Sequence, residues 1–507
     1  MKLAEHLKYR RQFVFSNRAF EFISDWVRFE FKEAGYTLYS HPDLEFSHGR
    51  NQHKGITLVM LGFAFDHTRK ELTNQQIVDD ILAASETVEG VVKKISRLAG
   101  RHVFILSMNG QVYMMHDPAG LRSVYYTYQD NVFVAGSQPL IINEVIPLQK
   151  TENHRLYIES KHYKENIEYW MPCGLTLYEN TKQLLPNHYL HVDTLEQIRF
   201  WPDKKIAPQD YKAIAEDGGQ MLRDLIEAAN NRYKLALAVT AGFDSRSLLA
   251  ASRDIASDIY LYTMVYYKLN DGSPDVRIPS SMLRKFNLQH NILNCHKEVD
   301  PAFLDLIKSN VDLAHPGYAT ISHGIMEHFP KDHLVVKGSV SEIARCSLYR
   351  SGRHAEVVKG MQLAADWKEW EELPFISDYL DKWVHANKQL CLDSNIDIFD
   401  LWYLEVFMGN WQAQNQLEKD IVHDVFSPYS YRPLIEIMLG VDIRYRLHDD
   451  PVLHKTMIRN MWPQLLNPRW PVNPHPYRRK NRLKYRMAGI FYDWGVYELA
   501  KKFYPKL

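Results

Sequence analysis

The sequence has few cysteines for its length, and they lie far apart. Cys173, Cys295, Cys346 and Cys391 are the four cysteines among 507 residues, and no two of them form a CxxC pair. Cysteines with this spacing favour neither a disulfide framework nor a zinc site, and they are typical of reduced thiols inside the cell. We therefore expect a cytoplasmic protein.

The sequence also lacks an excess of charge and a long apolar run. Lysine plus arginine and aspartate plus glutamate number 61 each, so no overall field favours nucleic acid or an acidic membrane surface. The apolar run at residues 56–65 is about half as long as a membrane span. The basic first residues do not lead into the apolar stretch of a secretory signal. We expect neither a membrane nor a nucleic-acid partner, whereas a homo-oligomer is left open.

The length favours two or three domains, and the first half has the pattern of an antiparallel sheet. Short β-branched and aromatic runs alternate there with turn residues, at 56–65, 102–109, 111–117, 123–130 and 131–137. Asn109-Gly110 between two of these runs predicts a hairpin, because both residues tolerate positive φ. Apolar spacing predicts a helix at about residues 77–99. We interpret residues 1–205 as an α+β domain.

The second half changes to helical segments that alternate with single apolar strands. The predicted strands are residues 234–239, 259–265 and 333–336. Strands separated by helices are typical of βαβ units in a parallel sheet. From residue 355 onward the pattern is mostly helical. We therefore interpret residues 206–507 as an α/β domain with a helical C-terminal part.

Residues 235–252 have the pattern of a buried strand, a tight polar turn and a helix. The unpaired N–H groups at such a helix start attract anions, so a phosphate can be held there without a lysine. Gly242 permits close approach, and the hydroxyls of Thr240 and Ser245 can donate to phosphate oxygens. Asp244 would repel bare phosphate, so it indicates a Mg²⁺ ion between them. The alternative is a plain turn in which Asp244 caps the helix.

This loop resembles the SGGxDS motif of the asparagine synthetase family, which includes the β-lactam synthetases. Thr240 stands in place of the serine and Ala241 in place of the first glycine. The resemblance implies an Ntn-hydrolase-like sandwich, followed by an ATP-pyrophosphatase (PP-loop) domain of the adenine nucleotide alpha hydrolase-like kind. The nucleotide-binding core would lie at about residues 232–345. The resemblance also implies ATP and Mg²⁺ as cofactors.

Two further segments are similar to nucleotide-binding parts of the family. The resemblance implies that the backbones of Val239 and Val265, at two strand ends, face the adenine, and that Asp275 is the acidic residue after the adenine-contacting strand. Residues 336–342 resemble the glycine-rich GxGxDE turn, where a carboxylate shares the Mg²⁺ with the loop aspartate.

In that turn Gly338 and Ser339 would contact the nucleotide, and Ser341 takes the aspartate position. Glu342 is then the acidic candidate for the second metal contact. The alternative is that Glu342 is a helix-start residue beside Arg345.

Three residues near the end of the chain are candidates for catalysis by the same resemblance. Asp424 stands four residues before Pro428-Tyr429, where the family has a carboxylate, and it would orient or deprotonate the amine. Lys455 falls where the family has a lysine that steadies the pentavalent phosphorus and the leaving pyrophosphate, and Arg459 one turn later could share that role. The alternative for Lys455 is a solvated helix position.

The first domain resembles the glutaminase domain of the family without its nucleophile. The similar segments are residues 97–104, 117–122, 134–137, 186–192 and 200–201, and the first fifty residues match nothing. Glutaminases of this fold use an N-terminal cysteine whose α-amino group is the base. Lys2 occupies that place. We therefore expect no glutaminase activity.

The motifs predict an ATP-dependent ligase that adenylates a substrate carboxylate and passes the acyl group to an amine or ammonia. A second hypothesis is a non-catalytic nucleotide-binding relative that serves as a partner or sensor, because Ala241 and Ser341 depart from the motifs. A third is an enzyme that modifies a macromolecule, suggested by the basic cluster at residues 478–486. The alternative for that cluster is a solvated helix face.

Overall fold

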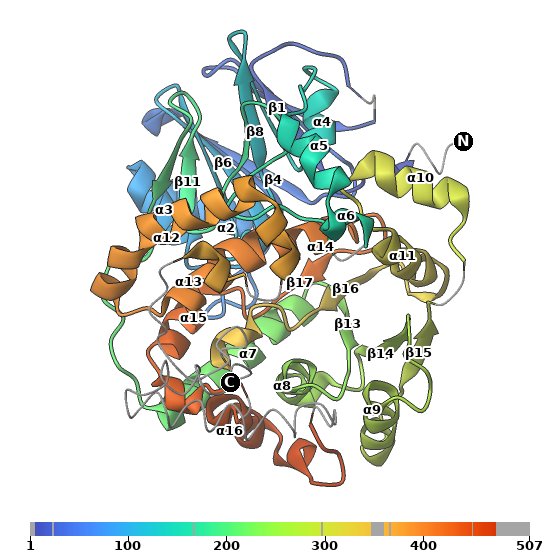
Figure 1. The fold of residues 1–507 in the computed structure, drawn as a ribbon. Helices are drawn as coiled ribbons and strands as arrows, with labels where there is room; N and C mark the ends of the chain where they lie inside the picture. Colours follow the sequence, from blue (N-terminus) through green and yellow to red (C-terminus); the bar gives the residue numbers. More distant parts are fainter. Residues whose placement is uncertain are drawn as a thin grey trace, which may run out of the picture.

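The computed structural model describes residues 6–472, with gaps at 23–24, 166–167, 296–297, 346–358, 365–366 and 449. The fold is a mixture of helices and three sheets, two of them antiparallel and one parallel (Figure 1). Lys2 and the basic segment 478–486 lie outside the described residues.

The first part of the chain forms two six-stranded sheets, with strand orders β10-β8-β9-β1-β3-β2 and β12-β11-β7-β6-β5-β4. The strands are β1 Phe13–Ser16, β2 Val27–Phe31, β3 Tyr36–Ser40, β4 Phe46–Asn51, β5 Ile56–Phe65, β6 Ala99–Met108, β7 Gln111–His116, β8 Tyr125–Gln129, β9 Val132–Gly136, β10 Thr181–Gln183, β11 His188–His191 and β12 Glu196–Arg199. All pairings within them are antiparallel. The predicted antiparallel α+β arrangement is confirmed. Strands β1–β4 belong to it, although the first fifty residues resemble no segment of the family's glutaminase domain.

The helix predicted at 77–99 was wrong in its extent. The structure has two helices there, α2 Asn74–Ala84 and α3 Val88–Ile95, each capped at its N-terminus by a threonine hydroxyl. Thr87 is the second cap, and it interrupts the apolar pattern. Ala99, the predicted helix end, is the first residue of β6. The other helices of this part are η1 Gln52–Lys54, α4 Pro139–Asn143, α5 Glu152–Glu159 and α6 Lys161–Lys164.

The second part of the chain contains a five-stranded parallel sheet in the order β15-β14-β13-β16-β17. The three predicted strands are present as β13 Lys234–Ala238, β14 Tyr260–Val265 and β16 His333–Val336. The sequence interpretation missed β15 Asn291–Asn294 and β17 Val425–Phe426, which form the two edges. Both are short, and β15 is polar, so neither carries a clear apolar signal.

Helices pack on both faces of the parallel sheet and extend beyond it (Figure 1). They are α7 Tyr211–Asn230, α8 Phe243–Ala251, η2 Arg253–Ile255, α9 Pro274–Lys285, α10 Pro301–Asn310, α11 Pro316–His328, η3 Ser341–Ala344, η4 Gly360–Gln362, η5 Lys368–Glu372, α12 Pro374–Ser394, α13 Ile398–Trp402, η6 Tyr403–Gln412 (a π-helix), α14 Ala413–Leu417, α15 Arg432–Leu439, η7 Ile443–Tyr445, α16 Val452–Met461 and η8 Pro463–Leu466. The predicted helical C-terminal part is thus present in the described residues.

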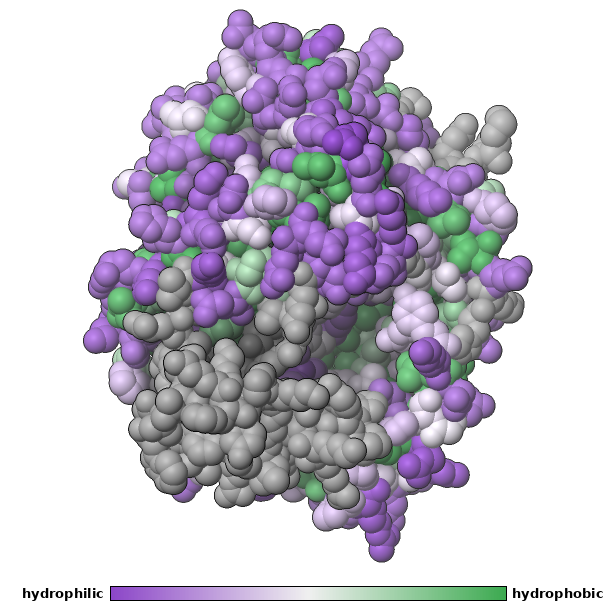
Figure 2. All heavy atoms as spheres, viewed as in Figure 1, coloured by the Kyte–Doolittle hydropathy of each residue, from purple (hydrophilic) through white to green (hydrophobic). Residues whose placement is uncertain are grey.

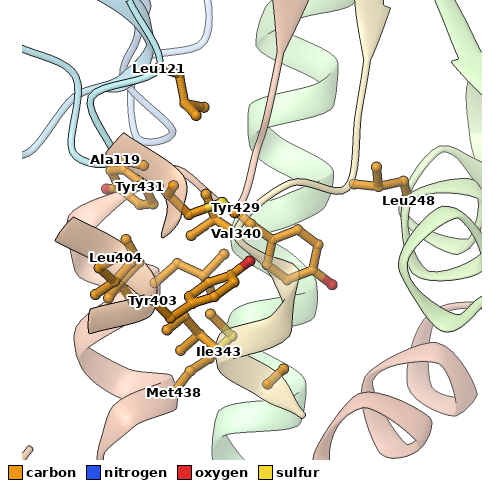
Figure 3. Packing of buried hydrophobic residues seen from close by; sticks show 14 of the residues in the cluster. Ala119, Leu121, Leu248, Val340, Ile343, Tyr403, Leu404, Tyr429, Tyr431 and Met438 are labelled. Atoms are coloured by element: carbon orange, nitrogen blue, oxygen red, sulfur yellow. The ribbon is translucent and has the colours of Figure 1, made fainter. Parts of the chain in front are cut away.

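The largest hydrophobic cluster joins the two parts. It contains Phe63 and Trp170 of the first part together with Leu237, Val336 and Tyr403 of the second. Figure 3 shows a portion of this cluster, where side chains of the turn after β16 meet residues of η6 and α15. The boundary near residue 205 stays a prediction, since buried apolar residues are continuous across it. None of the described helices is long and apolar enough to span a membrane.

Candidate functional site

The predicted phosphate loop connects β13 to α8 and ends at an uncapped helix start. Gly242 is the N-cap residue of α8, and within the described part of the chain no side-chain cap bond is present there. Phe243, Asp244 and Ser245 are the first three residues of the nine-residue helix. Free N–H groups at a helix start carry partial positive charge, so this end of α8 can receive an anion.

The loop stands where the strand order of the parallel sheet reverses. The chain proceeds from β13 to β14 and β15 on one side, and then returns to β16 and β17 on the other. The crevice at the carboxyl ends of strands beside such a reversal is the usual ligand position in open α/β sheets. The loops after β13 and β16 also touch: a Cβ on Gly338 would lie 2.8 Å from Cβ of Asp244.

The loop hydroxyls hold the loop in shape. Oγ of Ser245 accepts a hydrogen bond from the Thr240 N–H at 3.0 Å. The two hydroxyl oxygens, Oγ of Ser245 and Oγ1 of Thr240, lie 3.0 Å apart. Oγ1 of Thr240 also accepts from the Gly242 N–H, at 3.2 Å. Asp275, at the start of α9, accepts from the Ala241 N–H at 3.0 Å. Thr240, Ser245 and Asp275 therefore position the loop backbone, and phosphate contacts by the two hydroxyls stay a prediction.

Ala241 does not obstruct the loop surface, although a glycine was expected there. Its side chain is fully buried, in the same cluster as Val239 and Leu248. The additional methyl group therefore packs into the core beneath the loop.

The backbones predicted to face an adenine are engaged inside the sheet. The N–H of Val239 donates to Tyr262 at 2.8 Å, and its carbonyl accepts from the Thr263 hydroxyl at 2.5 Å. The carbonyl of Val265 accepts from the Cys295 N–H at 2.9 Å. These three groups complete strand pairing, and contact of either backbone with an adenine stays a prediction.

Asp244 is bound by a residue that the sequence interpretation did not include as a site residue, Arg345. The guanidinium donates to Asp244 through Nε at 3.1 Å and Nη2 at 2.8 Å, and to Glu342 at 2.6 Å. Oγ of Ser341 also donates to Asp244, at 2.7 Å. Burial alone would raise the pKa of Asp244, but Arg345 first, then His454 and Ser341, lower that pKa below its usual value. Asp244 is therefore a charged carboxylate.

The predicted metal ligands do not fit a protein-held Mg²⁺ ion in this arrangement. Asp244 and Glu342 do come together, but the Arg345 guanidinium stands between them and neutralises the charge that a metal would need. In the described part of the chain, no group of three or more histidine, cysteine, aspartate or glutamate side chains is arranged to hold a metal. Glu342 is the second residue of the short helix η3 and lies beside Arg345, which agrees with the alternative expectation for this residue.

Helix α16 brings the predicted lysine to the loop. Nζ of Lys455 lies 5.8 Å from the ring centroid of Phe243 and forms an ion pair with Asp450. Arg459, in the last turn of the same helix, is exposed. Lys455 is therefore beside the start of α8, whereas the role of the exposed Arg459 stays a prediction.

The same helix carries a histidine that the sequence interpretation missed. His454 is fully buried, its ring centroid lies 5.9 Å from that of Phe243, and Nε2 lies 3.3 Å from the Tyr429 hydroxyl. That hydroxyl donates to Oγ of Ser247 at 2.9 Å. Burial lowers the pKa of His454 to about 4, so the ring is neutral near pH 7. No local pattern marks His454 in the sequence, because its partners are distant along the chain.

Asp424 lies away from the loop. It precedes β17, where Val425 pairs with Val335, which in turn pairs with Ala236 of β13. Asp424 is thus at the start of its strand, whereas the phosphate loop follows the end of β13.

The Asp424 carboxylate is held by Arg101 at 2.9 Å and Arg122 at 2.7 Å. Burial opposes the charge, but Arg122 and Arg101 lower the pKa of Asp424 far below its usual value. A carboxylate that is so strongly paired is a poor base, so the arrangement does not support the predicted role of Asp424 toward an amine.

The surface is hollowed in front of β13 and β16, as Figure 2 shows in the orientation of Figure 1. Ser339, in the turn after β16, has a buried hydroxyl without a hydrogen-bond partner among the described residues. The site thus combines a free helix start, a carboxylate pair bridged by Arg345, and the nearby cation of Lys455.

Comparison with known proteins gives no family. No family model matches the sequence, and no curated protein matches it. Among solved structures, glutamine phosphoribosylpyrophosphate amidotransferase from B. subtilis, complexed with ADP and GMP, matches with 10% identity and a TM-score of 0.26, over 62% of this chain and 90% of that chain. An allosteric regulatory enzyme of purine biosynthesis matches with 11% identity and a TM-score of 0.26, over 57% and 76%. At these TM-scores neither match carries an argument.

Proposed function

We propose that the protein is an ATP-dependent ligase that adenylates a carboxylate and forms an amide. A carboxylate oxygen would attack the α-phosphorus of ATP and release pyrophosphate, and an amine or ammonia would then attack the acyl carbon and release AMP. The main support is the uncapped start of α8 at the reversal point of the parallel sheet, bordered by Lys455. The resemblance of the loop to the asparagine synthetase motif adds the reaction class.

In this proposal the N–H groups at the start of α8 hold the nucleotide phosphates. Lys455 stabilises the charge that develops as pyrophosphate leaves. Arg345 keeps Asp244 charged and fixed, and together they set the position of the loop. The proposal includes no step through a metal ion held by the protein, because Arg345 occupies the position between the two carboxylates.

The decisive experiment is ATP–pyrophosphate exchange with the purified protein and a panel of carboxylates. Exchange demonstrates adenylation before the amine is known. Exchange that depends on one carboxylate and disappears in Asp244→Asn supports the proposal. If every carboxylate, amino acids included, gives only background exchange while ATP binds, the ligase assignment fails.

A second candidate is a nucleotide-binding protein without catalysis. Asp244 accepts two hydrogen bonds from Arg345 and one from Ser341. Its carboxylate oxygens are thus already engaged within the protein, which favours this second candidate. Such a protein would bind ATP tightly and release no pyrophosphate. Isothermal titration with ATP, carried out beside the exchange assay, separates the two candidates.

A further inference from the structure

Two lysines beyond the ends of β16 and α14 donate to the same acceptor and form no direct ion pair among the described residues. Lys337 directly follows β16, and Lys419 follows α14 by two residues. Nζ of Lys419 donates to Oδ1 of Asn415 at 2.6 Å, and Nζ of Lys337 donates to the same oxygen at 3.2 Å. Neither ammonium forms an ion pair with a carboxylate among the residues that the structure describes. The two amines therefore meet at an amide oxygen and not at a carboxylate.

Burial makes the charged forms of both amines less favourable. Burial lowers the pKa of Lys419 to about 8, although Glu418 and Glu168 act in the opposite direction. Burial also lowers the pKa of Lys337 well below its usual value, and the charges of Lys419 and Arg101 lower it further. Both amines are therefore harder to protonate than solvated lysines, and an anion bound between them would favour their charged forms.

The lysine pair lies at the same edge of the sheet as the phosphate loop. Lys337 precedes Gly338, the residue that touches Asp244. Side chains alternate along a strand, so Lys337 follows the direction of Val335, which packs in the cluster with α11. Nζ of Lys419 lies 5.5 Å from the ring centroid of Tyr318, also on α11.

Both lysine side chains are half-buried, and so retain contact with solvent. Their partial exposure lets an anion approach the two amines.

We propose that Lys337 and Lys419 bind the carboxylate group of the ligase substrate. This inference rests on the proposed function. The ATP phosphates already have donors at the start of α8 and at Lys455, which lie on a different loop and helix. A second anion must enter the site before adenylation, and that anion is the carboxylate. Two ammonium groups that converge on one point can each donate to one carboxylate oxygen.

Competitive labelling tests the anion site directly. The full-length protein is treated with trace acetic anhydride at pH 8, and acetylation of each lysine is measured by mass spectrometry. The probes are acetate, succinate, benzoate and glycine at matched ionic strength, and ATP alone. At least one carboxylate should reduce the labelling of Lys337 and Lys419 severalfold, while exposed Lys331, just before β16, is unchanged.

Two results of this experiment overturn the inference. Labelling of the pair that no carboxylate reduces shows that no carboxylate binds there. Protection by ATP alone, without protection by any carboxylate, assigns the pair to nucleotide phosphate.

Variants give a second and independent test. In the exchange assay, Lys337→Met and Lys419→Met should each raise KM for the carboxylate about tenfold or more and leave the Kd of ATP unchanged, whereas Lys331→Met should change neither. The thermal midpoint of Lys337→Met should stay or rise, because an amine whose charge is disfavoured by burial is removed. An unchanged KM, or a clear fall in the midpoint, refutes the assignment.

The two tests separate this inference from the ligase proposal. If no carboxylate supports exchange but carboxylates still protect the pair, the ligase proposal fails and the anion site stands. If exchange occurs equally in wild type and Lys337→Met, the ligase stands and the anion site fails.

Discussion

Two groups of arginines and carboxylates in the molecule differ in their charge balance and in their exposure to solvent. Arg101 and Arg122 pair with Asp420 and Asp424 where the first sheets meet the parallel sheet, and the side chains of Arg101 and Asp420 are only 1% and 2% exposed. We call these four residues the closed cluster. Two cations there balance two anions, and its contacts join segments about 300 residues apart along the chain.

Asp244, Arg345 and Glu342 form what we call the open cluster. One cation lies between two anions, and the side chains of Asp244 and Glu342 are 30% and 26% exposed. The balanced, buried group is suited to holding two parts of the fold together. The unbalanced, accessible group can exchange partners when a ligand arrives. Position relative to the strand ends separates them, since the open cluster follows the strands and Asp424 precedes one.

The largest effect is expected on stability, from breaking the closed cluster. Arg101→Met leaves Asp420 buried without its main partner and should lower the free energy of unfolding by about 3–5 kcal/mol. Urea denaturation measures this loss. Arg69→Met is the control, because Arg69 pairs with Asp66 and Asp80 on the surface and should cost less than about 1 kcal/mol. Equal losses for the two variants would show that the closed cluster has no special role.

The open cluster should respond in activity. Asp244→Asn should lower exchange by roughly 10²-fold, because Arg345 loses the charged partner with which it positions the loop. The thermal midpoint should stay near wild type, because the change removes little packing. ATP affinity should hold or increase, since one negative charge near the phosphates is lost. Asp254→Asn, exposed just beyond α8, is the matched control. A stability loss as large as that of Arg101→Met would make the open cluster structural too.

Lys455 tests whether a cation beside the start of α8 acts in the chemical step or only in nucleotide binding. Lys455→Met should slow adenylation by roughly 10²-fold and leave ATP affinity nearly unchanged. Arg459→Met, one turn later and exposed, should have little effect. Single-turnover measurements distinguish binding from chemistry. Normal rates in the double variant would remove Lys455 from the site and favour the non-catalytic candidate.

The smallest effect concerns acid stability near the open cluster. The pKa of buried His454 is lowered to about 4. Between about pH 6.5 and 4 this histidine is therefore protonated in the unfolded chain and neutral in the folded state. Stability from this group is therefore lost as pH falls through that range, by about 2 kcal/mol at pH 5.

The test compares the free energy of unfolding at pH 7 and pH 5 in three proteins. His454→Gln should reduce the difference seen in the wild type. His53→Gln, at an exposed position, should keep it. A His454→Gln variant with an unchanged difference would contradict the assignment of a neutral, buried ring.

Some of this architecture could be predicted because its signals are local. The ten-residue apolar run of β5 was predicted with the observed ends. The Asn109-Gly110 turn has the positive φ values, 53° and 80°, that the hairpin prediction required. The loop between β13 and α8 followed from its own sequence. Short edge strands such as β17 have too few residues to give a pattern.

The missed site residues depend on contacts between distant segments. Arg345 is 101 positions from Asp244, and Lys337 is 78 from Asn415. In the sequence each is an ordinary charged residue, and only the packed fold shows which partner it has. For Asp424, the spacing to Pro428 suggested a catalytic carboxylate, but Arg101 and Arg122 come from strands whose pairing with this segment no local pattern reveals.

At Gly338 the loop after β16 packs directly against the loop after β13. A side chain there would collide with Asp244, so the two backbones are in contact with no spacer between them. A displacement of the start of α8 toward this turn would therefore press directly on the backbone between Lys337 and Ser339.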